Sequence, residues 1–426
     1  MMDLVQTAVS FGGIALCAMA LVQFALWSAQ SLSLIFANKK QFELSQQLLR
    51  KQIENSSPPK QSKPEPIAGH WSGYRTFCVV KLVKETPDCT SVYLQPEDGK
   101  PISSFRAGQH LTFKFKIAGE PKPVVRCYSL SDRPDQDFYR ITVKSVPAPH
   151  DRTDLPPGLA SNFVHDSLRI NDRIEVKAPS GHFVLDEAST APIVFLAGGI
   201  GITPMLSMIN HLIATNSDRM MLLVYGVRNG SQHAFKKCLS DLEKKHANLH
   251  LLNCYSQPNL EDIEGDDYQF NGYASVDHLK SILPSKQCQF YLCGPPPFMA
   301  SLYADLMDWE VCETQVFFEA FGQKSVRKTC KYQSTGTASN DDKVCVKFAT
   351  SNITAEWNSD CDSLLELAEL NRAIIDSGCR AGSCGTCETG LLKGEVVYPE
   401  NQAIECPPGK CLACIARPKG PVELDA

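Results

Sequence analysis

The chain has 426 residues, of which 43% are hydrophobic and 21% are charged. This is the composition of ordinary globular proteins, and it excludes wholesale disorder and fibrous architecture. Lys and Arg total 42 against 47 Asp and Glu, so the net charge is −5, and the chain lacks the basic excess that would make nucleic acid an expected partner. Six of the 18 cysteines lie between Cys379 and Cys414, and this crowding favours a metal site over a disulfide framework.

The N-terminal residues 1–38 are predicted to form a transmembrane anchor. No charged residue lies between Asp3 and Lys39, and the apolar run over 11–37 is long enough to cross a hydrocarbon core of about 30 Å as one helix. A cleaved signal peptide is the alternative, although the segment lacks a positively charged start and its apolar run continues past Ala20. Positive charge follows the run, which predicts that the catalytic domains face the cytoplasm, at the inner membrane if the source is bacterial.

Residues 39–70 connect the expected anchor to the rest of the chain. Leu44, Leu48, Leu49 and Ile53 lie near helical spacing among Gln, Lys and Glu, which predicts either a juxtamembrane amphipathic helix or a solvated stalk. The segment 56–66 is rich in Pro, Ser and Lys, a composition typical of an extended spacer.

Six short runs rich in Val, Ile, Phe and Tyr fall within residues 71–187. They span 77–82, 91–94, 111–117, 126–131, 139–146 and 173–177, with Gly, Pro and Asp between them. This spacing predicts a small antiparallel β-barrel.

Two motifs in this region point to a bound diphosphate. Arg126, Cys127, Tyr128 and Ser129 are consecutive in one predicted strand, where alternation puts Arg126 and Tyr128 on one face. The segment from Gly158 to His165 has the pattern of a turn that opens a helix, whose first N–H groups are available to an anion. Together they suggest a diphosphate between Arg126 and the helix start.

With these motifs the chain resembles the ferredoxin–NADP reductase-like flavoprotein superfamily, whose flavin barrel carries an Arg-x-Tyr-Ser strand and a Gly-x-x-Ser helix start. The resemblance implies FAD, with FMN as the alternative. It implies that Arg126 contacts the flavin phosphates, that Tyr128 packs against the isoalloxazine or ribityl, and that Ser129 lies near flavin N5. The other residues that it places at the flavin are Cys127, Val143, Lys144, Gly158, Ala160 and Ser161.

Residues 190–323 have the pattern of a nicotinamide-binding α/β domain. The apolar run 192–197 is followed by Gly198, Gly199 and Gly201, which predicts a buried parallel strand and a loop that a dinucleotide pyrophosphate can approach closely. Thr203 is the expected helix cap, with Pro204 at the first helical position. Pro204 also stands where the third glycine of G-x-G-x-x-G would lie, and no acidic residue ends the next strand, 221–227, so the usual dehydrogenase fingerprint is absent.

The same loop is similar to that of the superfamily's nicotinamide domain, as is the segment 291–299, which predicts strand, turn and helix. The resemblance places Thr203, Cys293, Gly294 and Pro295 around the nicotinamide ring, and it makes Phe321 the candidate aromatic that covers the flavin. Without the motif, Cys293 would be taken for a buried core thiol.

The preferred nicotinamide follows from the charges near the ends of the central strands. Arg228 is followed by Asn229, and the other candidate positions are Ser256 and Gln257. A 2′-phosphate calls for clustered Arg or Lys, so NADH is favoured and NADPH is the alternative.

After a polar linker over 324–342, residues 343–426 are predicted to form a β-grasp ferredoxin domain. Strands are expected over 344–349 and 353–357, and a helix over 362–371. Cys379, Cys384 and Cys387 have the x4 and x2 spacing of plant-type ferredoxins in a Gly-rich loop, which predicts a 2Fe-2S cluster.

The fourth cluster ligand is Cys411 or Cys414. The ferredoxin pattern Leu-x-Cys-x-Ala-x-Pro is similar to residues 412–418 and favours Cys414. A zinc site is the alternative, but the paired spacing of zinc knuckles is missing.

The order of flavin barrel, nicotinamide domain and ferredoxin resembles that of reductase components of oxygenases. It implies hydride transfer from NADH C4 to flavin N5, arranged by the three candidate catalytic residues Ser129, Thr203 and Cys293. Single electrons would then pass through the cluster to a protein acceptor, such as a membrane-bound oxygenase, hydroxylase or desaturase. A respiratory NADH:quinone oxidoreductase and a membrane-linked redox sensor are the alternatives; membrane quinone reductases with one anchor place the ferredoxin before the flavin domain.

Overall fold

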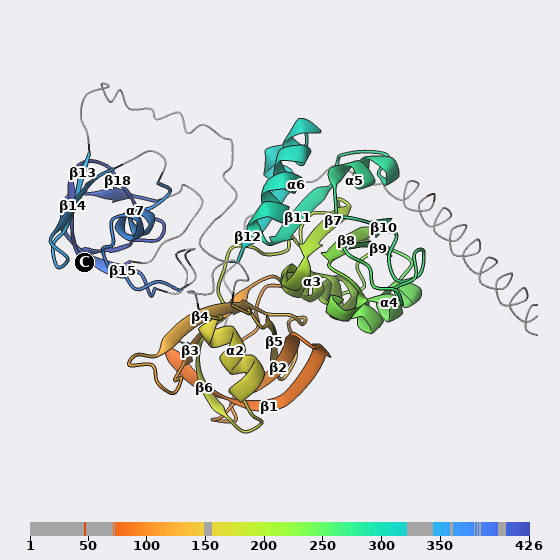
Figure 1. Ribbon diagram of the computed structural model, residues 1–426, viewed down its shortest axis with the longest axis horizontal. Helices are drawn as coiled ribbons and strands as arrows, with labels where there is room; N and C mark the ends of the chain where they lie inside the picture. Colours follow the sequence, from red (N-terminus) through yellow and green to blue (C-terminus); the bar gives the residue numbers. More distant parts are fainter. Residues whose placement is uncertain are drawn as a thin grey trace, which may run out of the picture.

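The computed structural model describes residue 47, residue 71 and residues 73–148, 156–321, 344–357, 361–378, 380, 382, 385–398 and 406–426. Figure 1 shows three folded regions in chain order: the β1 to β6 barrel, the α/β region from β7 to β12, and a C-terminal region beginning at β13. No helix within the described ranges combines the length and apolar character needed to cross a bilayer. The anchor expected over 1–38 and most of the connecting segment 39–70 lie outside those ranges.

The first region is a six-stranded antiparallel sheet in the order β4-β3-β6-β1-β2-β5. Its strands are β1 (Tyr74–Thr86), β2 (Cys89–Pro96), β3 (His110–Phe115), β4 (Val124–Ser129), β5 (Tyr139–Lys144) and β6 (Arg173–Lys177). A bridge between Leu130 and Ile141 joins the chain after β4 to β5 and so brings the two edges of the sheet together. The expected barrel is confirmed.

A short helical segment crosses the barrel between β5 and β6. It consists of α2 (Leu159–Asn162) followed by one turn of π-helix, η1 (Phe163–Ser167). Phe163 packs against Phe115 of β3 with ring centroids 5.7 Å apart, and Phe115 lies 6.3 Å from the Tyr128 ring of β4. The two flavin motifs expected from the sequence are therefore joined through one aromatic cluster.

The second region is a six-stranded parallel sheet in the order β10-β9-β8-β7-β11-β12. Its strands are β7 (Ile193–Gly198), β8 (Met221–Val227), β9 (Leu249–Tyr255), β10 (Phe270–Asn271), β11 (Gln289–Gly294) and β12 (Val316–Ala320). Its helices are η2 (Gly199–Gly201), α3 (Ile202–Ala214), η3 (Gly230–Gln232), α4 (Lys236–Lys245), α5 (Val276–Ile282), α6 (Pro296–Asp308) and η4 (Glu313–Gln315).

Helices cover both faces of this sheet. One buried cluster joins alternate residues of β7 and β8 to α3 and α4, and another joins the intervening residues to α5 and α6. The strands are apolar on both faces for this reason, as expected for a parallel sheet.

The start of α3 differs from the expectation. The helix begins at Ile202, with Gly201 in the capping position and a 3-10 turn, η2, before it. Thr203 is thus the second helical residue, and its hydroxyl donates to the carbonyl of Ile200 at 3.1 Å. The prediction of Thr203 as the cap was wrong because the glycine turn winds directly into the helix.

The C-terminal region is a mixed five-stranded sheet in the order β14-β13-β19-β15-β17, with a two-stranded β16-β18 pair and one helix. Its elements are β13 (Cys345–Phe348), β14 (Ile353–Glu356), α7 (Leu364–Leu370), β15 (Glu388–Lys393), β16 (Val396–Val397), β17 (Lys410–Leu412), β18 (Arg417–Pro418) and β19 (Val422–Asp425). Ser363 caps α7 by accepting from the N–H of Glu366. The two strands and the helix expected here are confirmed, whereas the linker over 324–342 lies outside the described ranges.

Polar contacts fasten the barrel to the nicotinamide domain. The carbonyl of Asp132, which follows β4, accepts from Ser207 of α3 at 2.7 Å, and its carboxylate accepts from Asn210 at 3.1 Å. Arg140 of β5 pairs with the Asp132 carboxylate at 3.2 Å and stacks over the Phe235 ring at 5.3 Å. These contacts join the barrel to the nicotinamide domain.

Candidate functional site: a dinucleotide cavity, a flavin strand and a thiol pair

A cavity of about 480 Å³ opens at the carboxyl ends of the parallel strands. Gly198 at the end of β7 and Pro295 just after β11 both line it. The chain runs outward from β7 through β8 and β9, then returns to place β11 on the other side of β7. Such a reversal is where open α/β sheets bind ligands.

The glycine loop at this cavity combines close packing with open backbone. A Cβ at Gly201 would lie 2.1 Å from the carbonyl oxygen of Cys293, so only glycine lets η2 approach the end of β11. Gly199 has a φ of +53°, a Cβ added to it would meet no atom within 4 Å, and it lines the cavity. The loop therefore presents bare backbone where a pyrophosphate would lie, as expected from the sequence.

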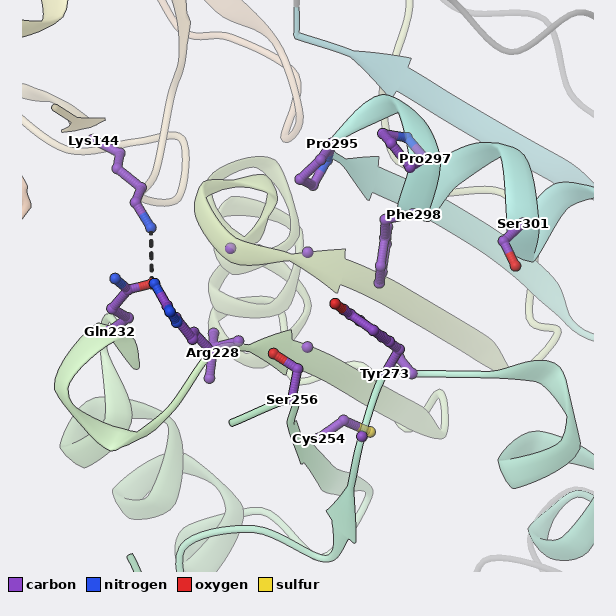
Figure 2. Close-up of a pocket in the computed structure, with 16 residues that line it drawn as sticks. Lys144, Arg228, Gln232, Cys254, Ser256, Tyr273, Pro295, Pro297, Phe298 and Ser301 are labelled. Atoms are coloured by element: carbon purple, nitrogen blue, oxygen red, sulfur yellow. Dashed lines mark hydrogen bonds between the residues drawn. The ribbon is translucent and has the colours of Figure 1, made fainter. Parts of the chain in front are cut away.

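Two aromatic side chains stand opposite each other at the cavity. Figure 2 shows Tyr273, which follows β10, facing Phe298 at the start of α6. Tyr273 is 80% exposed, which is unusual for an aromatic residue beside an apolar wall. The two rings offer flat apolar surfaces to a ligand in the cavity. The sequence analysis missed the pair because Tyr273 belongs to no recognised motif and Phe298, although it lies in the segment 291–299, was given no role there.

Two cations lie at the other end of the cavity. Lys144 of β5 pairs with Asp88 at 3.1 Å and donates to Gln232 of η3 at 3.4 Å, as Figure 2 shows for the second contact. Arg228, which follows β8, donates to Gln257 at 2.8 Å. Lys144, which the sequence places at the flavin, is a barrel residue that also lines this cavity.

The barrel strand β4 presents the expected flavin residues. Arg126 is exposed and donates to the carbonyl of its neighbour Val125 at 2.7 Å. Cys127 contacts the hydroxyl of Thr112 at 3.3 Å. Burial raises the pKa of Tyr128 above its ordinary value, so this phenol stays neutral. The exposed guanidinium and the packed ring suit a phosphate and a flat apolar ring respectively.

The helix start expected at the pyrophosphate is present. Gly158 is the capping residue of α2, and the Ser161 hydroxyl donates to the Gly158 carbonyl at 3.1 Å. Ala160 and Val143 are each 2% exposed and belong to the barrel core.

Three side chains meet where the barrel touches the nicotinamide domain. The Ser129 hydroxyl at the end of β4 donates to Oε2 of Glu319 in β12 at 3.2 Å. Nδ1 of His110, the first residue of β3, lies 3.6 Å from Oε1 of the same carboxylate. Ser129 was expected in the site, but His110 and Glu319 were missed because no local pattern relates residues 190 or more positions apart.

The remaining predicted residues lie around this meeting point. Cys293 pairs with Glu319 across β11 and β12 and is fully buried, and burial raises its thiol pKa well above the ordinary value. Gly294 approaches Gly198 so closely that a Cβ would lie 3.0 Å from the Gly198 Cα. Phe321, just after β12, is 37% exposed and so can cover a neighbouring group.

The cluster region is described in part. Sγ of Cys387 lies 3.0 Å from Sγ of Cys414, and both thiols are buried. Cys379 and Cys384 lie outside the described ranges. Among the residues that are described, no three metal-ligating side chains lie close enough together to hold a metal ion. Cys411 pairs with Thr389 in the sheet, and burial raises the pKa of its thiol to about 12. The convergence of Cys387 and Cys414 fits a shared metal cluster and favours Cys414 as the fourth ligand.

Three family models match the chain, one for each region. They are the oxidoreductase FAD-binding domain over residues 83–185, the oxidoreductase NAD-binding domain over 195–303 and the 2Fe-2S iron-sulfur cluster binding domain over 346–419. The residues present fit these groups: an exposed arginine with a helix start, a glycine-lined cavity and a converging thiol pair.

Curated relatives include flavohemoproteins. Those of Bacillus anthracis and Bacillus subtilis (strain 168) are 40% and 33% identical over 254 and 258 residues, or 60% and 61% of this chain. The chain spans about three fifths of their length, since the matches cover 62% of each relative.

Solved structures extend the comparison. The FAD/NAD-binding domain of nitric oxide dioxygenase from Vibrio cholerae O1 biovar El Tor is 28% identical with a TM-score of 0.53, covering 58% of this chain and 99% of that one. Phthalate dioxygenase reductase is 24% identical with a TM-score of 0.51 and shares the fold over 83% of this chain and 98% of its own. The protein therefore carries FAD-binding, NAD-binding and 2Fe-2S domains in that order, and it is an oxidoreductase.

Proposed function

We propose that this chain is a membrane-anchored, NADH-dependent reductase that passes electrons from NADH through FAD and a 2Fe-2S cluster to a protein acceptor. The observation that carries the proposal is the dinucleotide cavity, which is lined by both the nicotinamide domain and Lys144 of the flavin barrel. A nucleotide bound there touches both domains at once. The Cys387 and Cys414 pair then supplies an exit for single electrons in the same chain.

The arrangement favours hydride transfer by positioning. Bound FAD would supply the acceptor for the hydride, with its phosphates at Arg126 and the start of α2. Ser129, Cys293 and Thr203 lie at or near the junction of β4, β11 and α3, where they would orient the reacting rings. Holding two reactants in the reactive orientation can lower the activation barrier by about 7 to 11 kcal/mol in well-oriented systems.

NADH is the proposed donor. Within the cavity, Arg228 and Lys144 are the cations among the described lining residues, and each already has a polar partner. Ser256 is the neutral lining residue near the end of β9. A 2′-phosphate is usually recognised by basic side chains. Because both cations here already have polar partners of their own, we propose that the site takes the ribose hydroxyls of NADH.

The acceptor is proposed to be a membrane-bound oxygenase, hydroxylase or desaturase. Phthalate dioxygenase reductase, which is described as a modular structure for electron transfer from pyridine nucleotides to 2Fe-2S, supports the direction of flow. The apolar run at 11–37 and the positive residues after it support an anchor with the catalytic domains in the cytoplasm.

The test is oxygen-free NADH oxidation by the full-length protein in detergent, with cytochrome c and a short-chain quinone compared as acceptors. We expect cytochrome c reduction that Cys414→Ser abolishes, while ferricyanide reduction through the flavin persists. Quinone reduction that is fast, saturable and abolished by the same variant would support the respiratory alternative instead. A wild-type protein that oxidises NADH with ferricyanide but reduces neither other acceptor would contradict the proposed electron path.

A further inference from the structure

The carboxylate of Glu319 is held from the barrel side by two residues that face each other across β3 and β4. His110 and Ser129 are cross-strand partners in the register of these strands. Ser129 reaches Oε2 of Glu319 at 3.2 Å and His110 reaches Oε1 at 3.6 Å. Glu319 belongs to the nicotinamide domain, so His110 and Ser129 of the barrel contact one carboxylate across the domain boundary.

His110 is itself fixed more firmly than a surface histidine would be. It is 4% exposed, and its N–H and carbonyl both pair with Ser180 at 2.9 Å. The Ser180 hydroxyl lies 3.4 Å from Nε2, the opposite ring nitrogen. A Cβ at Gly181 would lie 2.8 Å from Nδ1, so the chain leaves the space that this ring occupies. The fold therefore aims Nδ1 at Glu319.

We propose that His110 is a positioning residue that holds the Glu319 carboxylate beside Ser129, so that Glu319 can accept a proton during electron transfer. This inference rests on the proposed function. NADH delivers two electrons and one proton as a hydride, whereas the 2Fe-2S cluster takes one electron at a time and no proton. Once both electrons had passed on, the proton that arrives with the hydride would have to leave the site.

Glu319 is suited to receive that proton. Its side chain is 18% exposed, so a proton on the carboxylate can pass on to water. The Ser129 hydroxyl, which donates to the same carboxylate, provides the link between the flavin side and Glu319. Without His110, one carboxylate oxygen loses its partner on the barrel side, and the side chain can turn away from Ser129.

The test compares His110→Leu, His110→Gln and Glu319→Gln in the full-length holoprotein. With saturating NADH, we expect His110→Leu to slow cluster reduction about tenfold, which corresponds to the loss of one contact of about 1.4 kcal/mol, and to raise the solvent isotope effect on that step in D2O. Flavin content and the KM for NADH should stay within about twofold of the wild-type values, which is well below the roughly tenfold change expected from the loss of one such contact. His110→Gln, whose amide can still reach Glu319, should recover most of the rate.

A double-mutant cycle separates positioning from general damage. Adding His110→Leu to Glu319→Gln should cause no further loss of rate, and the shifts in thermal unfolding midpoint should be less than additive because the two side chains share one contact. Additive effects, an unchanged rate in His110→Leu, or loss of flavin from that variant would each overturn the proposal. If His110→Leu does not fold, Ser180→Ala should show the same changes more weakly, and wild-type behaviour in Ser180→Ala would overturn the proposal.

The thermal cycle does not depend on any electron acceptor. A wild-type protein that fails to reduce cytochrome c would therefore refute the proposed function, and the coupling between His110 and Glu319 would still be measured. Coupling without any effect on cluster reduction would leave the proposed function standing and would refute the role of His110.

Discussion

Replacing Gly201 by alanine tests whether the close approach of η2 to β11 sets the geometry of hydride transfer. The new Cβ would lie 2.1 Å from the carbonyl oxygen of Cys293, and real Cβ contacts essentially never fall below 3.0 Å. The loop and the end of β11 must therefore separate by about 1 Å. A misplacement of that size costs about 100-fold in a reaction that depends on orientation.

The same substitution should also destabilise the nicotinamide domain. Forcing one extra methyl into a packed contact costs about 1 to 3 kcal/mol. At about 4 °C per kcal/mol for a domain of this size, the unfolding midpoint should fall by about 4 to 12 °C. Differential scanning calorimetry would measure this shift, and kinetic work well below the lowered midpoint keeps the variant folded.

The assay is anaerobic stopped-flow reduction of the flavin by NADH, followed at saturating NADH. Gly226→Ala is the matched control, because its Cβ would meet its nearest atom, on the flexible Phe298 side chain, at an ordinary 3.4 Å. We expect Gly226→Ala to change the KM but leave the limiting rate near that of the wild type. A Gly201→Ala protein that reduces its flavin at the wild-type rate would refute the reasoning from close approach.

Three further predictions concern the bound groups. Cys414→Ser should lose iron, measured by metal analysis, while Cys411→Ser keeps it. Equal iron content in the two variants would contradict the assignment of Cys414 as the fourth cluster ligand. Arg126→Ala should release flavin on gel filtration, since the exposed guanidinium is the cation expected at the phosphates, and full flavin occupancy would exclude that role. Tyr273→Ala should raise the KM for NADH about 5- to 150-fold, the cost of losing about 1 to 3 kcal/mol of base stacking, whereas Tyr273→Phe should not.

Much of the architecture was predictable because its signals are local. The strands of the barrel and of the parallel sheet show as runs of Val, Ile and Phe, and β8 lies at the residues expected for it. The glycine loop and the cysteine spacing are similarly contained in short stretches of chain. Such segments carry their own hydrogen-bonding and packing preferences, and they need no knowledge of the rest of the fold.

The parts that sequence reasoning missed depend on distant residues. His110 is a single histidine after a Gly-Gln pair, and only the register of β3 with β4 and the docking of β12 bring it to Glu319. Tyr273 gains its place opposite Phe298 from the order of strands in the parallel sheet. The Thr203 cap was misplaced for a smaller reason, because glycine-rich turns can begin a helix without a side-chain cap.

The buried cluster around β7, β8, α3 and α4 also contains Cys89, Ala107, Phe183 and Leu185 from the barrel. The family models separate between residues 185 and 195, but this apolar interior crosses that boundary. Separating the two modules there would expose both halves of the cluster to water. We therefore expect the first two modules to unfold together, and exchanging either alone between related reductases would require matching partners for Cys89 and Leu185.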